Sequence, residues 1–271
     1  MKTFNIDGGT LEYSVRGDGP PLLLLHGSVV ADPWEPMLSF AGLLGDYRVV
    51  TYRRRGYGGS LPAQAGRTLS DEGADAVALL DHLDINRAHA VGHSLAADIL
   101  LQAAIDAPER FAAIALLEPG LFSVPSAAGF DKAIRPVVQT FESGDHYPAM
   151  LLFLGGPGGS DVLARLEEAL PEGMTEMALA AVTTLFLSDI PAGSGWTLDE
   201  GAAQSLAHPI LLALGSDSGP IFSESNEVLA ALLPNVEKLD LADTGHFVHV
   251  EQPAVVAEHL ARFLRRHADS V

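Results

Sequence analysis

Short apolar runs recur along most of the chain, and longer amphipathic segments separate them. Most of the runs are continuously apolar, which is typical of parallel strands that are buried on both faces of a sheet. We therefore expect strands at LEYSV (11–15), LLLL (22–25), YRVVTY (47–52), AHAVG (88–92), FAAIALL (111–117), ILLAL (210–214) and VEKLDL (236–241).

Helical patterns lie between these runs. The segment 69–84 has an apolar stripe, with Ser70 and Asp71 as candidate caps. The segment 94–108 is rich in Ala and Leu, and 253–268 begins with Pro and carries arginines in its last turn. Strands that alternate with helices predict a three-layer α/β sandwich with a mostly parallel sheet.

The alternation stops between about residues 121 and 207, where amphipathic segments replace the strand runs. We interpret 121–207 as a helical cap, inserted into a core formed by 1–120 and 208–271. Such a cap would cover the carboxyl edge of the sheet, where open α/β folds bind ligands. We expect the glycine-rich stretches at 155–160 and 191–195 to be flexible joints, and Tyr147 and Trp196 are candidate wall residues of a pocket.

Composition narrows the classes of function. The 271 residues are 48% hydrophobic, enough for one large core. A net charge of −19 argues against nucleic acid or an anionic membrane as partner, and we see no apolar run of 18 residues that would span a bilayer. The absence of Cys excludes disulfides and a thiol nucleophile, and no metal-binding spacing is found. The start MKTFNIDGG lacks the apolar segment of a signal peptide, which favours a cytoplasmic location.

The stretch AVGHSLAAD (90–98) combines the end of a strand, a tight turn and the start of a helix. Its residues 92–96 fit G-x-S-x-G, with Ala96 in the last place. Such a turn holds the serine in a strained backbone and points its hydroxyl out of the sheet. We therefore predict Ser94 as a nucleophile, at the start of a helix whose dipole faces any negative charge that develops.

With these residues the chain resembles the α/β-hydrolase fold family over nearly all of its length. LLLLHGS (22–28) is similar to the family's strand followed by His-Gly. The resemblance implies an oxyanion hole made by the backbone N–H groups of Ser28 and Leu95. TYRRRGYGGS (51–60) resembles D-x-R-G-x-G-x-S, with Arg53 where aspartate is usual, and we expect structural roles for these arginines.

The base is expected in GHFVHVEQP (245–253), which resembles the family's catalytic histidine loop. His246 matches the catalytic position, whereas His249 lies further along and is the competing histidine. His26 and His93 flank the presumed oxyanion region, where we expect structural hydrogen bonds.

Two carboxylates compete for the third place of the triad. Asp217 follows the run ILLAL, where the family most often has its acid. However, the usual acid is the third residue after the glycine, and that position is Ser218. Because a shift by one residue turns an extended side chain to the opposite face, we favour Glu118, with Asp217 as the alternative. Glu118 ends the run AIALLEP and resembles the acid of zearalenone-lactonase-like members and of haloalkane dehalogenases.

The resemblance implies a serine hydrolase that needs no cofactor and no metal. We expect it to cleave a small carboxylic ester or lactone with a hydrophobic body through an acyl-enzyme. The same scaffold also supports C–C bond hydrolysis, perhydrolysis and cofactor-free oxygenation, and it can serve as a small-ligand receptor. The presence of all triad candidates favours an enzyme over a receptor.

Overall fold

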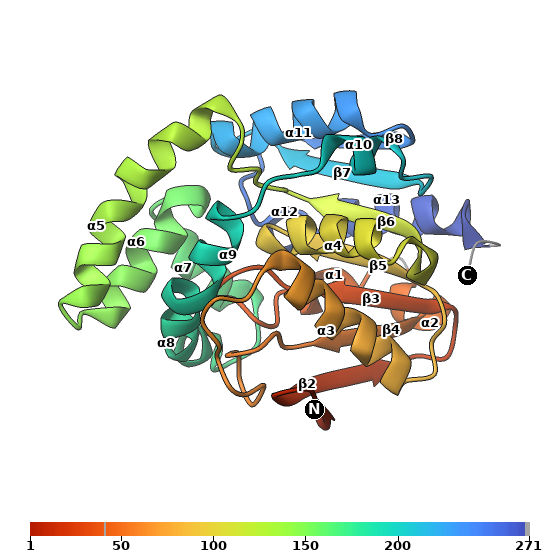
Figure 1. The fold of residues 1–271 in the computed structure, drawn as a ribbon, viewed down its shortest axis with the longest axis horizontal. Coiled ribbons are helices and arrows are strands. Elements are labelled where there is room, and N and C mark those ends of the chain that lie inside the picture. Colours follow the sequence, from red (N-terminus) through yellow and green to blue (C-terminus); the bar gives the residue numbers. More distant parts are fainter. Residues whose placement is uncertain (41, 269–271) are drawn as a thin grey trace.

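An eight-stranded sheet runs through the centre of the protein (Figure 1) in the computed structural model, which describes residues 1–40 and 42–268. The strand order is β1-β2-β4-β3-β5-β6-β7-β8. The pairs β1–β2 and β2–β4 are antiparallel, and all other neighbours are parallel. The strands are β1 (Lys2–Ile6), β2 (Gly9–Arg16), β3 (Pro21–Leu25), β4 (Arg48–Tyr52), β5 (Ala88–His93), β6 (Phe111–Leu117), β7 (Ile210–Gly215) and β8 (Val236–Leu241).

All seven predicted strands are present, and the predicted fold class is confirmed. The sequence reading missed β1, at the edge of the sheet, where Phe4 is the one buried side chain of the strand. An edge strand with a single buried residue has no apolar run, so the signal that identified the other strands is absent there.

Helices cover both faces of the sheet. Leu23 and Leu25 of β3 pack with α3 (Leu69–His82) and α4 (Leu95–Asp106) on one face, whereas Leu22 and Leu24 pack with α13 (Pro253–Arg265) on the other. The helices are α1 (Glu35–Leu38), α2 (Leu43–Asp46), α3 (Leu69–His82), α4 (Leu95–Asp106), α5 (Phe130–Glu142), α6 (His146–Gly158), α7 (Val162–Ala169), α8 (Met174–Thr184), α9 (Ile190–Ser194), α10 (Glu200–Gln204), α11 (Pro220–Leu232), α12 (Val248–Glu251) and α13 (Pro253–Arg265), with shorter turns η1 (Pro108–Arg110), η2 (Pro125–Gly129) and η3 (Leu185–Asp189).

The start of α3 differs from the expectation. Thr68 is the N-cap, and its hydroxyl accepts from the N–H of Asp71, whose carboxylate in turn accepts from the Thr68 N–H. Ser70 lies inside the helix. Thr68 and Asp71 stand three residues apart, as a reciprocal capping box requires, whereas Ser70 and Asp71 are adjacent.

Helices α5 to α10 lie between β6 and β7 in the chain, and α5 to α9 lie beyond the carboxyl ends of the parallel strands (Figure 1). The prediction of flexible joints at 155–160 and 191–195 was wrong in most of its residues. Helix α6 continues to Gly158 and α9 covers 190–194. Buried Ala149, Met150 and Leu154 hold α6 against the domain, so tertiary packing outweighs the low helix propensity of glycine.

Helix α8, the π-helical turn η3 and α9 form one continuous helix, Met174–Ser194. By length and composition alone it could cross a membrane, contrary to the expectation from the sequence. However, half of its most apolar window is buried inside the domain, as in a core helix of a soluble protein, so it is weak evidence for a span. Ala181, Val182 and Leu185 carry this packing.

Candidate active site

Ser94 occupies the turn between β5 and α4. Its backbone has φ 55° and ψ −131°, a strained conformation for a residue with a side chain. The neighbouring backbones are very close, because a Cβ on Gly92 would lie 2.2 Å from the carbonyl oxygen of Ala96. The small residues at these two positions therefore allow the turn that presents the Ser94 hydroxyl.

His246 lies in the loop between β8 and α12 and is 3% exposed. Its ring stacks on Phe222 of α11, with the ring centres 4.1 Å apart. Its backbone carbonyl accepts a hydrogen bond from Nε2 of His93, at 2.9 Å. These contacts fix both the loop and the plane of the imidazole.

Glu118 follows β6 directly and is fully buried, with φ 56°. Its Oε1 accepts from the Gly215 N–H at 2.5 Å, and its Oε2 lies 3.4 Å from Nδ1 of His246. Asp217, in contrast, is exposed, and its carboxylate accepts from the Ser216 hydroxyl. The structure therefore brings Glu118, and not Asp217, to the histidine.

Burial controls the protonation of this pair. It raises the pKa of Glu118 to about 8, although the Gly215 N–H acts in the opposite direction, and the charge of Glu251 adds to the rise. Burial also lowers the pKa of His246 to about 3. Near neutral pH the free protein therefore disfavours charge on both groups, and the carboxylate forms as the pH rises.

Ser94 and His246 both line a cavity of about 440 Å³ beneath the cap. Within residues 1–40 and 42–268 no hydrogen bond joins the Ser94 hydroxyl to the imidazole. Such bonds are often long in free enzymes and shorten when substrate binds. The wall is mostly apolar, and α5, α6 and η3 contribute Phe130, Val137, Leu154 and Leu185.

The predicted oxyanion residues flank the nucleophile. A Cβ on Gly27 would lie 3.0 Å from the Ser94 Cβ, so the loop after β3 runs directly beside the serine. No backbone carbonyl of the described chain accepts from the N–H of Ser28 or of Leu95, and both residues line the cavity. The next amide, that of Val29, instead donates to the Tyr57 hydroxyl.

The other histidines near the site, His26, His93 and His249, are buried in the protein interior. His26 Nδ1 donates to the Gly27 carbonyl, and its Nε2 accepts from the Arg54 N–H. His249, the competing base, is fully buried between the rings of Trp34 and His93, and its ring nitrogens have no hydrogen-bond partner among the described residues. Burial lowers the pKa of all three buried histidines, His26, His93 and His249, and so favours their neutral forms.

The three consecutive arginines all form ion pairs. Arg53 pairs with Glu12 and Asp32, and Arg55 pairs with Asp75. The buried Arg54 pairs with Glu72 and forms a bidentate ion pair with Asp189 of η3. Arg54 also donates to the carbonyls of His26 and Gly27, which holds in place the loop after β3 that carries the predicted oxyanion residue Ser28.

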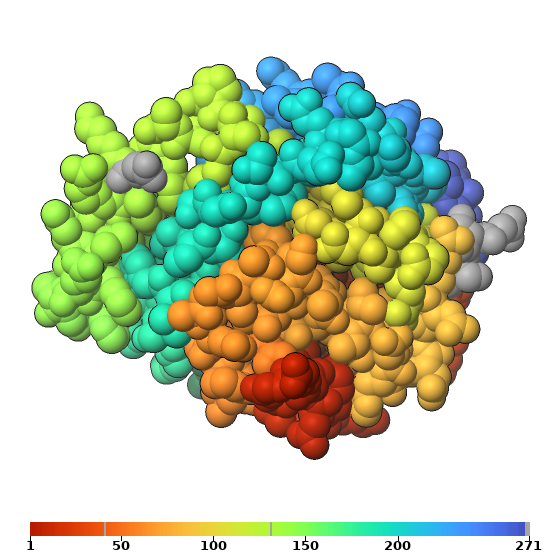
Figure 2. Space-filling model, in the orientation of Figure 1, coloured from red at the N-terminus to blue at the C-terminus, as the bar shows by residue number. Residues whose placement is uncertain are grey.

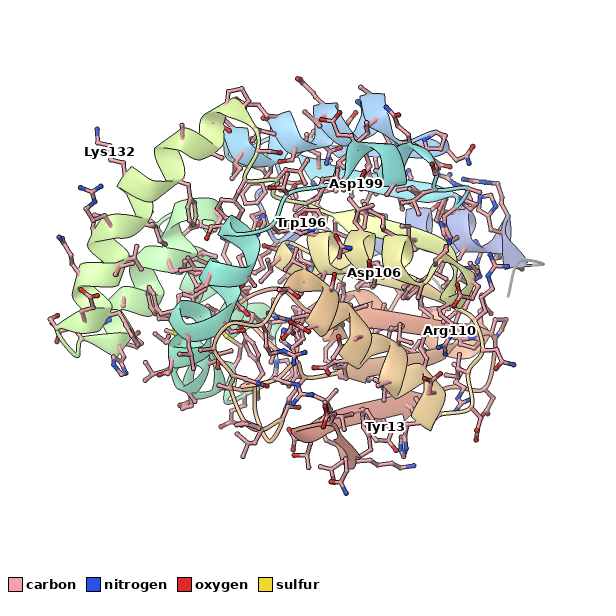
Figure 3. The ribbon with its side chains drawn as sticks, in the orientation of Figure 1. Tyr13, Asp106, Arg110, Lys132, Trp196 and Asp199 are labelled. Atoms are coloured by element: carbon pink, nitrogen blue, oxygen red, sulfur yellow. The ribbon has the colours of Figure 1, made fainter. Side chains whose placement is uncertain are left out.

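The sequence reading missed two residues of the cavity wall, Asp98 and Asp189. Each carboxylate interrupts an apolar helical stretch, and Asp98 stands four residues after Ser94, so both carried a readable signal. The candidate wall residues proved wrong: neither Tyr147 nor Trp196 lines the cavity. Tyr147 is exposed. Trp196 lies beside α4 (Figure 3), and its ring N–H donates to the side chain of Gln102 in that helix.

No group of three or more His, Cys, Asp or Glu side chains among the described residues could hold a metal ion. The groups that the site itself places around Ser94 are the imidazole of His246, the buried carboxyl of Glu118 behind it and the N–H groups of Ser28 and Leu95. Such a set suits nucleophilic attack on a carbonyl, with an oxyanion held by backbone N–H groups.

This sheet order, cap and strained serine turn define the class of protein. The chain belongs to the alpha/beta hydrolase family, whose model matches residues 22–259. The narrower resemblance to zearalenone lactonases remains a prediction.

Individual relatives agree with the family. The chain is 29% identical over 263 residues, 94% of its length, to the dihydrolipoyllysine-residue acetyltransferase component of the acetoin cleaving system of Pseudomonas putida. It is 28% identical over 205 residues, 70% of its length and 69% of the relative's, to the uncharacterized hydrolase YugF of Bacillus subtilis. The enol-lactonase of Burkholderia xenovorans superposes with a TM-score of 0.82, at 19% identity, over 97% of this chain and all of that one.

The chain spans 66% of the length of the Pseudomonas putida relative and 38% of the corresponding component from Cupriavidus necator. The family and the hydrolase relative support a hydrolase, and the structural likeness at 19% identity shows the fold alone.

Proposed function

We propose that the protein is a serine hydrolase that cleaves a carboxylic ester or lactone with a hydrophobic body, through Ser94, His246 and Glu118. The observation that carries the proposal is the meeting of three separate chain segments at one apolar cavity. A strained serine and a buried imidazole line its wall, and Oε2 of a buried glutamate lies 3.4 Å from the far nitrogen of that imidazole.

In the first step, Nε2 of neutral His246 accepts the proton of the Ser94 hydroxyl while Oγ bonds to the carbonyl carbon. The carbonyl electron pair moves to the oxygen, which the N–H groups of Ser28 and Leu95 stabilise. Ionised Glu118 accepts from Nδ1–H, which fixes the tautomer and stabilises the imidazolium.

The intermediate then expels the alcohol oxygen, and His246 returns the proton to it. Water repeats the sequence on the acyl-enzyme: His246 removes its proton, the oxygen attacks the acyl carbon, and Ser94 leaves with its hydroxyl restored. In a lactone the leaving alcohol remains attached to the acyl group, so the product is a single hydroxy acid.

The cavity supports an apolar substrate of modest size. A volume of about 440 Å³ lies in the range of small-molecule sites. Phe222 stacks on the imidazole and also closes the wall next to Gly120, so the reacting carbonyl would sit between an aromatic ring and the oxyanion loop.

An ester-directed serine probe, such as a fluorophosphonate, tests the proposal together with turnover of para-nitrophenyl esters. We expect labelling and turnover in the wild type and neither in Ser94→Ala. Ser28→Ala keeps its backbone N–H and removes a different hydroxyl from the cavity, so it should still be labelled. Equal behaviour of wild type and Ser94→Ala would refute the proposal, and labelling without turnover would favour a receptor.

A further inference from the structure

Asp98 places a carboxyl group in the wall of the same cavity. It lies in the first turn of α4 and is 2% exposed. Its Oδ2 accepts from the N–H of Gly120, at 3.4 Å. Its Oδ1 is buried and has no hydrogen-bond partner in the described parts of the chain.

Within the part of the chain that the structure describes, no cation compensates this carboxyl group. The buried carboxylates of Glu72, Asp75 and Asp189 all pair with arginines, whereas no ion pair of Asp98 is formed among the described residues. The other titratable groups of the cavity wall are Asp189, which Arg54 holds, and the histidines His93 and His246. Strands β5 and β6, which pack on α4, carry no Asp, Glu, Lys or Arg.

Burial without a cation favours the neutral acid and raises the pKa of Asp98 to about 8, although the Gly120 N–H acts in the opposite direction. The neutral group has distinct oxygens. Because Oδ2 accepts the amide hydrogen bond, it serves as the carbonyl oxygen, and Oδ1 then carries the proton. A buried O–H group without an acceptor costs free energy in the empty protein.

Asp98 lines the cavity, and although its Oδ1 is buried in the empty protein, a turn of the carboxyl group about its χ2 bond would point the O–H group at a ligand bound there. Asp98 lies in the first turn of α4, whose N-cap is Ser94, and both residues line the cavity. A group bound to Asp98 therefore lies only a few bonds from the scissile carbonyl. Ser126, also in the wall, has a second buried hydroxyl without a partner among the described residues.

We propose that Asp98 binds an oxygen acceptor of the substrate, so that the substrate is an ester or lactone with a second oxygen function near the scissile bond. This inference rests on the proposed function and deepens it. Asp98 is a specificity-determining residue: its O–H donates to an ether, carbonyl or hydroxyl oxygen. Plain hydrocarbon chains leave that donor unpaired and are disfavoured.

Two pairs of esters test the inference, and within each pair only one CH2 group is replaced by oxygen. For the acyl side the pair is para-nitrophenyl pentanoate and para-nitrophenyl methoxypropanoate, and for the alcohol side it is butyl acetate and methoxyethyl acetate. In the wild type we expect the oxygen-containing member of at least one pair to have roughly tenfold higher kcat/KM, about the effect of one hydrogen bond.

The variants separate donor chemistry from shape. Asp98→Leu should abolish or reverse the preference, whereas Asp98→Asn keeps an N–H donor and should retain most of it. Asp106→Asn removes an exposed carboxylate farther along the same helix (Figure 3) and should leave the ratio unchanged. A wild type without preference in either pair, or an Asp98→Leu variant with the wild-type ratio, overturns the inference.

A binding measurement distinguishes this inference from the proposed function. Calorimetric titration of Ser94→Ala with butyl acetate and methoxyethyl acetate requires no turnover, and the same titration of Ser94→Ala/Asp98→Leu is its control. If no ester is hydrolysed but methoxyethyl acetate binds better and the preference needs Asp98, the proposed function fails and the inference stands. Equal binding together with equal turnover within both pairs overturns the inference alone.

Discussion

Replacing Asp98 by Asn should change the free energy of unfolding, relative to the wild type, in favour of the variant as the pH rises. The carboxyl group is buried without a cation, and its pKa rises from 3.8 to about 8 on folding. Between these values the unfolded chain loses this proton and the folded chain keeps it. Each rise in pH therefore favours the unfolded chain, which has lost the proton. Between the two pKa values, the free energy of unfolding of the wild type falls by roughly 1.4 kcal/mol per pH unit relative to that of a variant with a non-titrating side chain.

The size of the effect follows from the same two values. From 3.8 to near pH 7, the difference in the free energy of unfolding between Asp98→Asn and wild type should grow by about 4 kcal/mol. Any constant effect of the amide on packing cancels, because only the change of the difference with pH is used.

Urea unfolding followed by tryptophan fluorescence at several pH values from about 5 to 8 measures this difference. Asp106→Asn, which removes an exposed carboxylate from the same helix, controls for the change in net charge. If the stability curves of Asp98→Asn and wild type run parallel over this range, Asp98 is already ionised in the folded protein. The argument for a neutral donor in the cavity would then fail.

Three further predictions concern the triad and its turn. Glu118→Gln should lower kcat by about 10³–10⁴-fold, whereas exposed Asp217→Asn should change it less than about twofold; the reverse pattern in ester turnover would exchange their roles. Because catalysis needs ionised Glu118 and neutral His246, whose pKa values are about 8 and about 3, kcat/KM should rise with pH up to about 8. The inflection of the kcat/KM profile near pH 8 should remain in Asp98→Asn and disappear in Glu118→Gln. An inflection that remains in Glu118→Gln would show that another group causes it. Gly92→Ala would place a Cβ 2.2 Å from a backbone oxygen, so chemical denaturation should show a loss of about 3 kcal/mol, and an unchanged midpoint would contradict the close approach.

The sequence predicted the parts of the site that depend on local chemistry. The turn at Ser94 needs a small residue two positions before the serine and another two positions after it. These positions lie within five consecutive residues, so the pattern can be recognised in the sequence. The choice of Glu118 followed from alternation, and the structure places Ser218, not Asp217, with a buried hydroxyl after β7. Residues 216–218 form a turn, however, so alternation pointed to the carboxylate that lies at His246 although the segment after Gly215 is not extended.

The sequence could not predict features that arise from packing between distant segments. Nothing near Asp98 indicates that its partner is a backbone N–H at Gly120, or that no cation lies opposite. Helix α6 was missed for the same reason, because its glycines and its internal Pro157 have low helix propensity and packing against the domain outweighs it. In Figure 2 the turquoise residues after the cap helices lie beside the yellow surface of α4, and no local sequence pattern predicts this contact.

The ion pair of Arg54 with Asp189 has a consequence for how substrate reaches the cavity. Asp189 also accepts from the Tyr57 hydroxyl at 2.5 Å, and all three side chains are buried. Separating them would break a buried ion pair and the hydrogen bond of Tyr57, although Arg54 would keep its contact with Glu72. These contacts tie the cap to the core at η3, and we expect them to limit the movement of the cap there when substrate enters the cavity.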